Sequence, residues 1–170
     1  MLNANSHKFL NIKSFSKSLN SLSCIKQNPS VAIAVSSGVD SMTLLHLSDM
    51  WAKKNKKKLF IITFDHNLRK ESINETNYVK KYSTQLGWPH KTLKWNKPTE
   101  KNVLENARIA RYLSISRFCK KLNIDSLLLA HHLDDMIETF CMRILKNSRI
   151  DGLCPMVCNR KLFDLNLIRP

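Results

Sequence analysis

The chain alternates between short apolar runs and longer segments in which apolar residues recur every three or four positions. Four apolar runs are predicted to form strands: 31–36, 59–64, 92–95 and 126–130. Helical patterns fill the gaps between them, at about 40–54, 71–86 and 102–122. This alternation is typical of βαβ units, in which successive strands lie parallel. We therefore predict an α/β fold, a Rossmann-like parallel sheet flanked by helices.

Further elements are predicted on both sides of this central part. A short amphipathic helix ahead of the sheet is indicated by apolar residues at helical spacing: Phe9, Ile12, Phe15 and Leu19. Another helix is predicted from about Leu133 to Lys146. The run Leu162–Ile168 is predicted to be one further strand.

The clearest chemical signal is the polar turn that ends the first predicted strand. The turn reads Ser36-Ser37-Gly38-Val39-Asp40-Ser41 and leads directly into a helical pattern. Free N–H groups and the helix dipole at such a helix start favour an anion such as phosphate. Asp40 suits a Mg²⁺ ion that bridges phosphates. An ordinary loop with a serine or aspartate N-cap is the alternative, and the missing Gly-Lys-Ser/Thr ending excludes a Walker A loop.

The segment after the fourth predicted strand combines two adjacent histidines with three acids. His131, Asp135 and Glu138 follow at helical spacing, which brings them onto one helix face. Such a face suits a metal ion or the ammonium group of a substrate. The alternative is a first helical turn enriched in acids because of the helix dipole. That alternative accounts for Asp134 but not for the histidines.

Two weaker polar motifs lie between these segments. Asp65, His66 and Arg69 follow the second predicted strand, where they suit contact with adenine, ribose or a tRNA phosphate. A plain polar loop, with Ser72 capping the next helix, is the alternative. Arg108 and Arg111 lie one turn apart in the third predicted helix and suit phosphate or acidic partners. An exposed charged helix face is the alternative here.

Composition narrows the class of protein. The net charge of +15 favours a polyanionic partner such as nucleic acid, although a lysine bias imposed by an A/T-rich genome would give the same surplus. Five cysteines without a matching pair at metal-site spacing favour reduced thiols and a cytoplasmic protein. No apolar run approaches the roughly 18 residues that would span a membrane.

Together, the order and spacing of the four motifs resemble the tRNA(Ile)-lysidine synthases, which are PP-loop ATP pyrophosphatases of the adenine nucleotide alpha-hydrolase type. That family carries Ser-Gly-Gly-Val-Asp-Ser, Asp-His-x-Leu-Arg, Ala-Arg-x-x-Arg-Tyr and His-His-x-x-Asp-x-x-Glu-Thr. The matching segments here begin at Ser36, Asp65, Ala107 and His131. The resemblance covers roughly residues 10–170.

The resemblance implies one PP-loop nucleotide-binding catalytic domain over residues 1–170, truncated at its C-terminal end. The cofactors it implies are ATP and Mg²⁺, with Asp40 near the metal. The residues that match the ATP phosphate loop are Ser36, Ser37, Gly38, Val39, Asp40 and Ser41. The residues that match positions around the lysine substrate and the activated base are Arg111, His131, Asp135 and Glu138.

The implied reaction is a two-step modification of the wobble cytidine of tRNA(Ile) with a CAU anticodon. ATP adenylates the C2 oxygen and releases pyrophosphate, and the amine of free L-lysine then displaces AMP. The implied partners are this tRNA and lysine, with a separate C-terminal half or a second copy as further candidates. Alternatives are another PP-loop enzyme, such as a tRNA thiolation enzyme, or an inactive or partner-dependent fragment that binds nucleotide or tRNA. Thiolation enzymes of the two-thiocytidine type use Cys-x-x-Cys pairs, which this chain lacks.

Some positions depart from the family pattern. Ser37 and Asn67 stand where the family has glycine, and Met136 stands where glutamine is usual. A serine forced into a positive φ angle would carry strain, whereas asparagine tolerates that geometry well. Activity therefore depends on whether the loop accepts Ser37.

Overall fold

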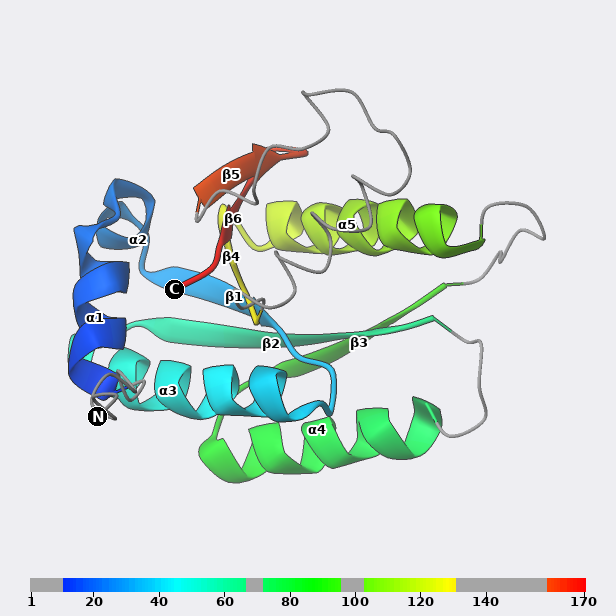
Figure 1. Ribbon diagram of the computed structural model, residues 1–170, viewed down its shortest axis with the longest axis horizontal. Helices are drawn as coiled ribbons and strands as arrows, with labels where there is room; N and C mark the ends of the chain where they lie inside the picture. Colours follow the sequence, from blue (N-terminus) through cyan, green and yellow to red (C-terminus); the bar gives the residue numbers. More distant parts are fainter. Residues whose placement is uncertain (1–10, 67–71, 96–102, 131–158) are drawn as a thin grey trace, which may run out of the picture.

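A computed structural model describes residues 11–66, 72–95, 103–130 and 159–170 (Figure 1). The elements along the chain are α1 (Ile12–Ser21), α2 (Ser23–Gln27), β1 (Ser30–Ala34), α3 (Val39–Asn55), β2 (Lys58–Asp65), α4 (Ser72–Leu86), β3 (His90–Lys94), α5 (Val103–Lys121), β4 (Ser126–Leu129), β5 (Asn159–Leu162) and β6 (Leu165–Ile168). The four strands and three helices predicted for the central part are confirmed, with ends within two residues of the prediction. The amphipathic helix ahead of the sheet is α1, and the helix predicted over 133–146 lies outside the described residues.

The sheet has the strand order β3-β2-β1-β4-β6-β5. The described pairs are parallel except β5 with β6, so the predicted parallel sheet carries one antiparallel edge strand. Because β2 and β3 lie on one side of β1 and β4 lies on the other, the chain changes winding direction at β1. Ligands of open α/β sheets bind at such a switch point, beyond the carboxyl ends of the strands.

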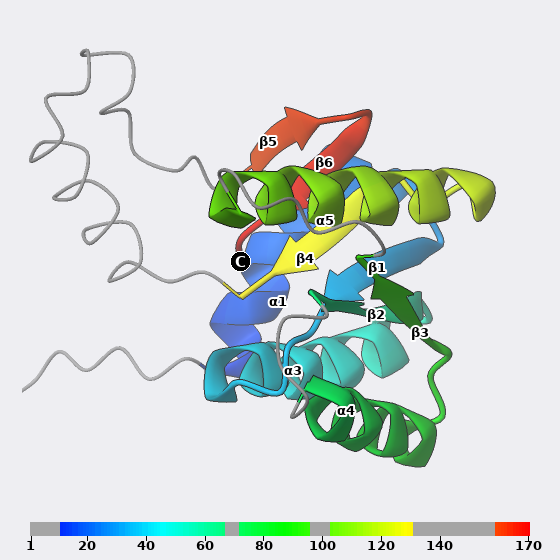
Figure 2. The same ribbon diagram turned by 90° about the vertical axis from the view of Figure 1, so that its right-hand side faces the viewer.

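Alternation along β1 divides the core into two layers. Val31 and Ile33 pack with the buried side chains of α1, α3 and α4 on one face of the sheet. Ala32, between them in the chain, packs with Tyr112, Ile115 and other residues of α5 on the opposite face. Successive strand residues point to opposite faces, so one buried strand serves both layers. Figure 2 shows α3 and α4 below the sheet and α5 above it.

The prediction of a single strand over Leu162–Ile168 is wrong. The run folds into a hairpin in which Leu162 pairs with Leu165. The two residues between them, Phe163 and Asp164, have φ angles of 49° and 63°. Two left-handed residues form the turn type that matches the twist of paired strands. The hydroxyl of Ser116 on α5 donates to the carbonyl oxygen of Phe163 at 2.6 Å and holds the turn against that helix.

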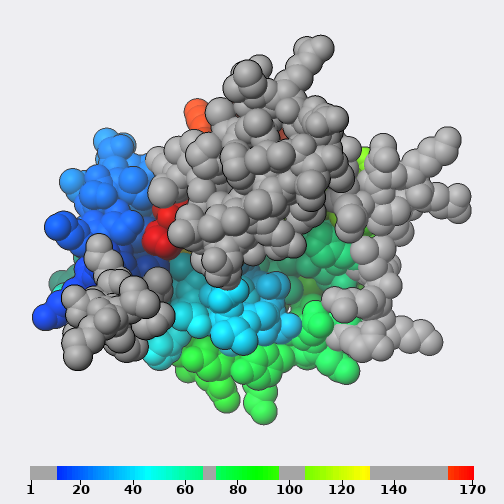
Figure 3. Space-filling model, viewed as in Figure 1, coloured from blue at the N-terminus to red at the C-terminus, as the bar shows by residue number. Residues whose placement is uncertain are grey.

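Partly buried polar contacts fix α3, which begins beside the loop after β1. Asp49, near the middle of α3, accepts a hydrogen bond of 2.6 Å from the indole N–H of Trp88. Lys53 forms an ion pair with the same carboxylate at 2.8 Å. The indole N–H of Trp51 donates to Asn20 of α1 at 2.9 Å. Figure 3 shows the surfaces of α1, α3 and α4 side by side on this face. Within the described part of the chain, no helix is long and apolar enough to cross a membrane.

Candidate functional site

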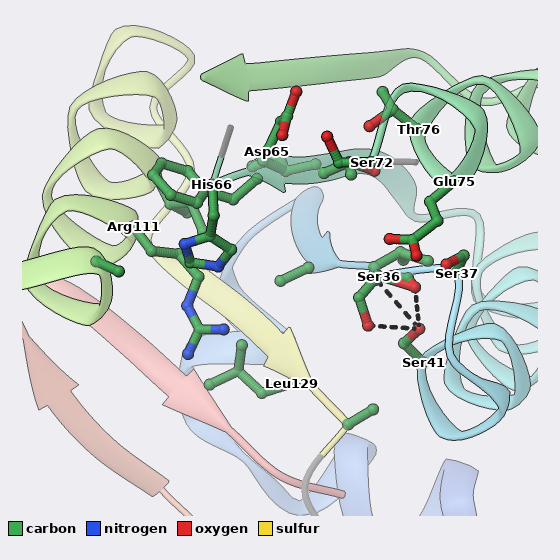
Figure 4. A pocket seen from close by; sticks show the side chains of 18 of the residues that line it. Ser36, Ser37, Ser41, Asp65, His66, Ser72, Glu75, Thr76, Arg111 and Leu129 are labelled. Carbon is green, nitrogen blue, oxygen red and sulfur yellow. Dashed lines mark hydrogen bonds between the residues drawn. The ribbon is translucent and has the colours of Figure 1, made fainter. Parts of the chain in front are cut away.

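A cavity of about 570 Å³ lies beyond the carboxyl ends of β1, β2 and β4 (Figure 4). One wall is the loop between β1 and α3, and the facing wall is α5. The first turn of α4 closes a third side. Its polar lining residues are Ser36, Ser37, Ser41, Thr63, Asp65, His66, Ser72, Glu75, Thr76, Arg108 and Arg111. The cavity therefore brings residues of three separate sequence motifs together at the switch point of the sheet.

The loop after β1 is held from inside by the hydroxyl of Ser41. This buried Oγ accepts a hydrogen bond from the backbone N–H of Ser36 at 3.1 Å. It also lies 3.1 Å from the Ser36 carbonyl oxygen and 2.9 Å from the Gly38 carbonyl oxygen, the two acceptors for its single proton. The Oγ of Ser36 lies 3.3 Å away, within the same cluster. The side chain of Ser41, in the first turn of α3, therefore sets the shape of the loop that precedes this helix.

The helix start at this loop carries no side-chain cap. The N-cap residue of α3 is Gly38, which makes no side-chain cap hydrogen bond. The capped-loop alternative, with serine or aspartate as the N-cap, is therefore wrong for this segment. A helix of 17 residues begins here, and backbone donors of its first turn are left for another acceptor. An uncapped helix start at the end of a parallel strand is suited to phosphate.

Ser37 does not adopt the left-handed backbone conformation that favours glycine. Among the described residues other than glycine, positive φ angles occur at Lys56, Asn123 and the two hairpin residues, and not at Ser37. A Cβ added to Gly38 would lie 3.6 Å from Ser36 Oγ, an ordinary contact. Serine in place of the family's glycine therefore meets no left-handed backbone at this position.

Asp40, the predicted metal residue, is an exposed side chain in the first turn of α3. It is not among the described residues that line the cavity. The described residues also contain no group of three or more histidines, cysteines and acids that would hold a metal ion. Mg²⁺ does not need such a cage, because proteins usually hold it with one or two carboxylates together with substrate phosphates. An exposed carboxylate next to an uncapped helix start fits that mode of binding.

The wall formed by α5 is cationic. The guanidinium of Arg111 lies 4.9 Å from the ring centre of Tyr112, and that of Arg108 lies 5.8 Å from it. Arg111 also donates to the Tyr112 hydroxyl at 3.4 Å. Its Nε atom is inaccessible to solvent and has no hydrogen-bond partner in the structure. Arg111 therefore lines the cavity, and its role toward a substrate stays a prediction.

His66, at the end of β2, faces the same part of the cavity. Its ring meets Phe64 edge to face, with centroids 4.9 Å apart and an interplanar angle of 74°. Burial lowers the pKa of His66 below its ordinary value, and the positive charge of Arg111 lowers it further. The negative charge of Asp65 raises the pKa of His66, with a smaller effect. His66 is therefore a neutral imidazole near pH 7.

Sequence reasoning missed the contribution of α4. Ser72, Glu75 and Thr76 in its first turn line the cavity, and Figure 4 shows the Glu75 side chain extending toward Ser36 and Ser37. Their position in the predicted topology would have indicated them, because this helix begins at the same sheet edge as the loop motifs. Ser72 was considered only as a helix cap, and no local motif marks Glu75 and Thr76.

His131, Asp135 and Glu138 lie outside the described residues and stay predictions. Ala130, the last described residue before them, lines the cavity. The structure brings to one cavity these residues that the sequence indicated: Ser36, Ser37, Ser41, Asp65, His66, Arg108 and Arg111. Gly38, Val39 and Asp40 are not among its lining residues.

Comparison with solved structures supports the fold. The chain is similar to the U34-tRNA thiolase NcsA from Methanococcus maripaludis, solved with its 4Fe-4S cluster, with a TM-score of 0.74 and 16% sequence identity. The likeness covers 93% of this chain and 58% of the thiolase. At this identity, it shows a shared fold.

Sequence comparison gives nearer relatives. The chain is 44% identical over 146 residues to a tRNA(Ile)-lysidine synthase of Wolbachia pipientis wMel, a match that covers 84% of this chain and 34% of the relative. It is 42% identical over 141 residues to a tRNA(Ile)-lysidine synthase of Rickettsia rickettsii strain Sheila Smith, covering 82% of this chain and 29% of that protein. The chain thus spans about a third of the length of these relatives.

The family profile described as the PP-loop domain matches residues 8–170, which is nearly the whole chain. The matched region includes the loop, the uncapped start of α3 and the cavity described above. The chain belongs to the PP-loop domain family.

Proposed function

We propose that this chain binds ATP in the cavity and uses it to attach lysine to the wobble cytidine of tRNA(Ile) with a CAU anticodon, forming lysidine. The observation that carries the proposal is the Ser36–Ser41 loop, locked by its own serines and followed by a helix start without a side-chain cap. The identity to proteins named tRNA(Ile)-lysidine synthase supports the choice of reaction.

The loop is the proposed site for the phosphates of ATP. Backbone donors at the start of α3 and the hydroxyls of Ser36 and Ser37 offer hydrogen bonds to phosphate oxygens. Asp40 would hold Mg²⁺, which neutralises the charge that develops on the departing pyrophosphate. Donors placed before the reaction stabilise that charge without reorganisation.

In the first proposed step, the C2 oxygen of cytidine attacks the α-phosphorus of ATP and pyrophosphate leaves. In the second, the amine of lysine attacks C2, the C2–oxygen bond breaks, and AMP departs with that oxygen. The attacking amine loses a proton, and a carboxylate such as Asp135 or Glu138 is the proposed acceptor. His131 and Arg111 are proposed to contact the activated base and the lysine.

The proposed polynucleotide partner agrees with the charge of the chain. A net charge of +15 attracts the phosphate backbone of tRNA and raises the rate of encounter at low salt. Free L-lysine is the second substrate. A C-terminal half carried on a separate chain, or a second copy of this chain, is a further proposed partner.

The proposal is tested by ATP-dependent incorporation of labelled lysine into a tRNA(Ile) transcript with a CAU anticodon. We expect incorporation by the wild-type chain and its loss in Asp40→Ala. Ser21→Ala, on the exposed surface of α1, is the matched control and should incorporate lysine normally. Binding of ATP without incorporation would contradict the ligase proposal and leave a nucleotide-binding role.

A further inference from the structure

A lysine-rich run joins the end of α3 to the start of β2. It reads Lys53-Lys54-Asn55-Lys56-Lys57-Lys58, and short runs this rich in lysine are typical of nucleic-acid-binding surfaces. Lys58 begins β2, and Asp65 at the other end of that strand lines the cavity. The run therefore lies at the edge of the sheet opposite the cavity. Figure 1 shows this edge on the left, where α3 ends and β2 begins.

Lys57 holds this corner of the fold together. Its Nζ donates to three carbonyl oxygens at the end of α2: Ile25 at 2.8 Å, Lys26 at 3.1 Å and Asn28 at 2.6 Å. The backbone N–H of Lys58 donates to the carbonyl oxygen of Pro29 at 2.8 Å. The charge of Lys57 is therefore used within the fold, where it ties the start of β2 to the end of α2.

Four lysines around Lys57 are exposed to solvent. They are Lys26, Lys54, Lys56 and Lys58, and we call them the lysine platform. Lys53, in the same run, forms the ion pair with Asp49 instead. Among the residues that the structure describes, no ion pair involves a platform lysine. The platform is thus a group of exposed positive charges on a backbone that Lys57 fixes.

Helix dipoles account for only part of this cluster. Lys26 and Lys54 lie in the last turns of α2 and α3, where a positive charge is favourable. Lys56 and Lys58 lie beyond the end of α3, so that reason does not apply to them. Acids are also scarce, because residues 11–64 hold eight lysines and two acids. Clustered like charges repel one another, and a polyanion that neutralises them is favoured.

The platform is too far from the cavity to serve a small ligand bound there. The eight residues of β2 lie between them, and a strand of this length spans roughly 20–25 Å. A folded RNA is large enough to contact both places. Lysine ammonium groups act as point charges that suit phosphate oxygens. The chemistry and the distance together point to the backbone of a nucleic acid.

We propose that the lysine platform is a second RNA-binding surface, which contacts the phosphate backbone of the tRNA while the wobble base occupies the cavity. The inference rests on the proposed function, which supplies the RNA. Contacts to phosphates position an RNA without reading its sequence. The platform therefore contributes affinity, and the cavity contributes the choice of base.

The test is the affinity of the 170-residue chain for a tRNA(Ile) transcript, measured by fluorescence anisotropy between about 50 and 200 mM salt. The triple variant Lys54→Gln/Lys56→Gln/Lys58→Gln removes three charges and keeps Lys57. We expect tRNA affinity to fall about tenfold or more, and the slope of log affinity against log salt to become shallower by about 2–3. The affinity for MgATP should stay unchanged, which shows that the variant is folded.

The matched control removes the same charge from exposed positions on β3 and α5. It is Lys91→Gln/Lys120→Gln/Lys121→Gln, and we expect it to lower tRNA affinity less than about threefold. Equal losses in the two triple variants would overturn the platform, because the lysine surplus would then act only as a diffuse charge. A platform variant that binds tRNA as wild type does would also overturn it, as would a wild-type chain that binds no tRNA.

A transcript with another anticodon tests the backbone role. The platform variant should lose the same factor in affinity for this RNA, because phosphate contacts carry no sequence information. A loss confined to the CAU transcript would contradict the proposal.

Failure of the platform is distinguishable from failure of the proposed function. If the platform variant binds tRNA normally while wild type incorporates lysine, the function stands and the platform falls. If the platform variant binds tRNA weakly but wild type incorporates no lysine, the platform stands as an RNA-binding surface and the ligase proposal falls.

Discussion

The buried hydroxyl of Ser41 accepts a hydrogen bond from the backbone N–H of Ser36 at 3.1 Å. One serine at the first turn of α3 thereby holds the residue that opens the loop at the end of β1. The proposed phosphate-binding surface depends on this contact, because the hydrogen bond holds the backbone of the loop in its shape.

Replacement of Ser41 by alanine should loosen the loop and destabilise the fold. The change leaves the N–H of Ser36 without its acceptor, and we expect a loss of about 1–3 kcal/mol in the free energy of unfolding. MgATP should also bind more weakly. Urea unfolding and calorimetry measure the two effects.

Ser48→Ala on the same helix is the matched control. The Oγ of Ser48 is buried and has no hydrogen-bond partner in the structure. Its removal should leave the free energy of unfolding unchanged or raise it. Equal destabilisation by both variants would contradict the role given to Ser41.

Ser37→Gly, which restores the family's residue, should change little. Ser37 is not among the described residues with a positive φ angle, so glycine relieves no strain. We expect MgATP affinity within about twofold of wild type and a loss in unfolding free energy of less than about 1 kcal/mol. A large gain in either quantity would show that serine distorts the loop.

Asp164→Gly should stabilise the hairpin of β5 and β6. Asp164 has a φ angle of 63°, which glycine adopts more readily than aspartate. The expected gain is about 0.5–1 kcal/mol in a urea unfolding experiment. Lys161→Gly, on the neighbouring strand, should have the opposite sign because glycine weakens a strand.

Stability should fall as the pH is lowered through the range in which histidine titrates. Burial, followed by the charge of Lys80, lowers the pKa of His90, whose Nε2 lies 3.0 Å from the Thr63 hydroxyl. His66 is shifted in the same direction. Unfolded histidine takes up its proton near pH 6.5, about its ordinary pKa, while the folded groups stay neutral to lower pH. The unfolded chain therefore binds more protons below that pH and is favoured there.

The measurement is the melting temperature of wild type and His90→Gln between pH 7.5 and 5, about the range over which histidine charges. The variant should lose less stability on acidification, because it lacks one of the two shifted groups. His46→Gln, an exposed residue of α3, is the control and should follow the wild-type curve. Parallel curves for wild type and His90→Gln would contradict the assignment.

Periodicity was sufficient for the central fold because its inner strands bury continuous apolar runs and α3 buries a face of spaced leucines. The β-branched run from Val31 and the spaced leucines of α3 locate their elements to within two residues. The hairpin at Phe163 and Asp164 was missed because the pair lacks the glycine that usually marks such a turn.

The site was predictable only in part. The sequence of the Ser36–Ser41 loop was enough to locate it. The N-cap of α3 is Gly38, however, and not a serine or aspartate. The approach of His66 to Arg111 depends on how α5 crosses the end of β2. No spacing within the sequence encodes that crossing.

The central claim is that the phosphates of ATP bind at the Ser36–Ser41 loop, and the most direct test is the affinity of Ser37→Asp for MgATP. A carboxylate at this position would repel a bound phosphate, and we expect the dissociation constant to rise about tenfold or more. Ser21→Asp, which adds the same charge on α1, should bind as wild type does. If Ser37→Asp binds MgATP as tightly as wild type, the phosphates lie elsewhere and the account is contradicted.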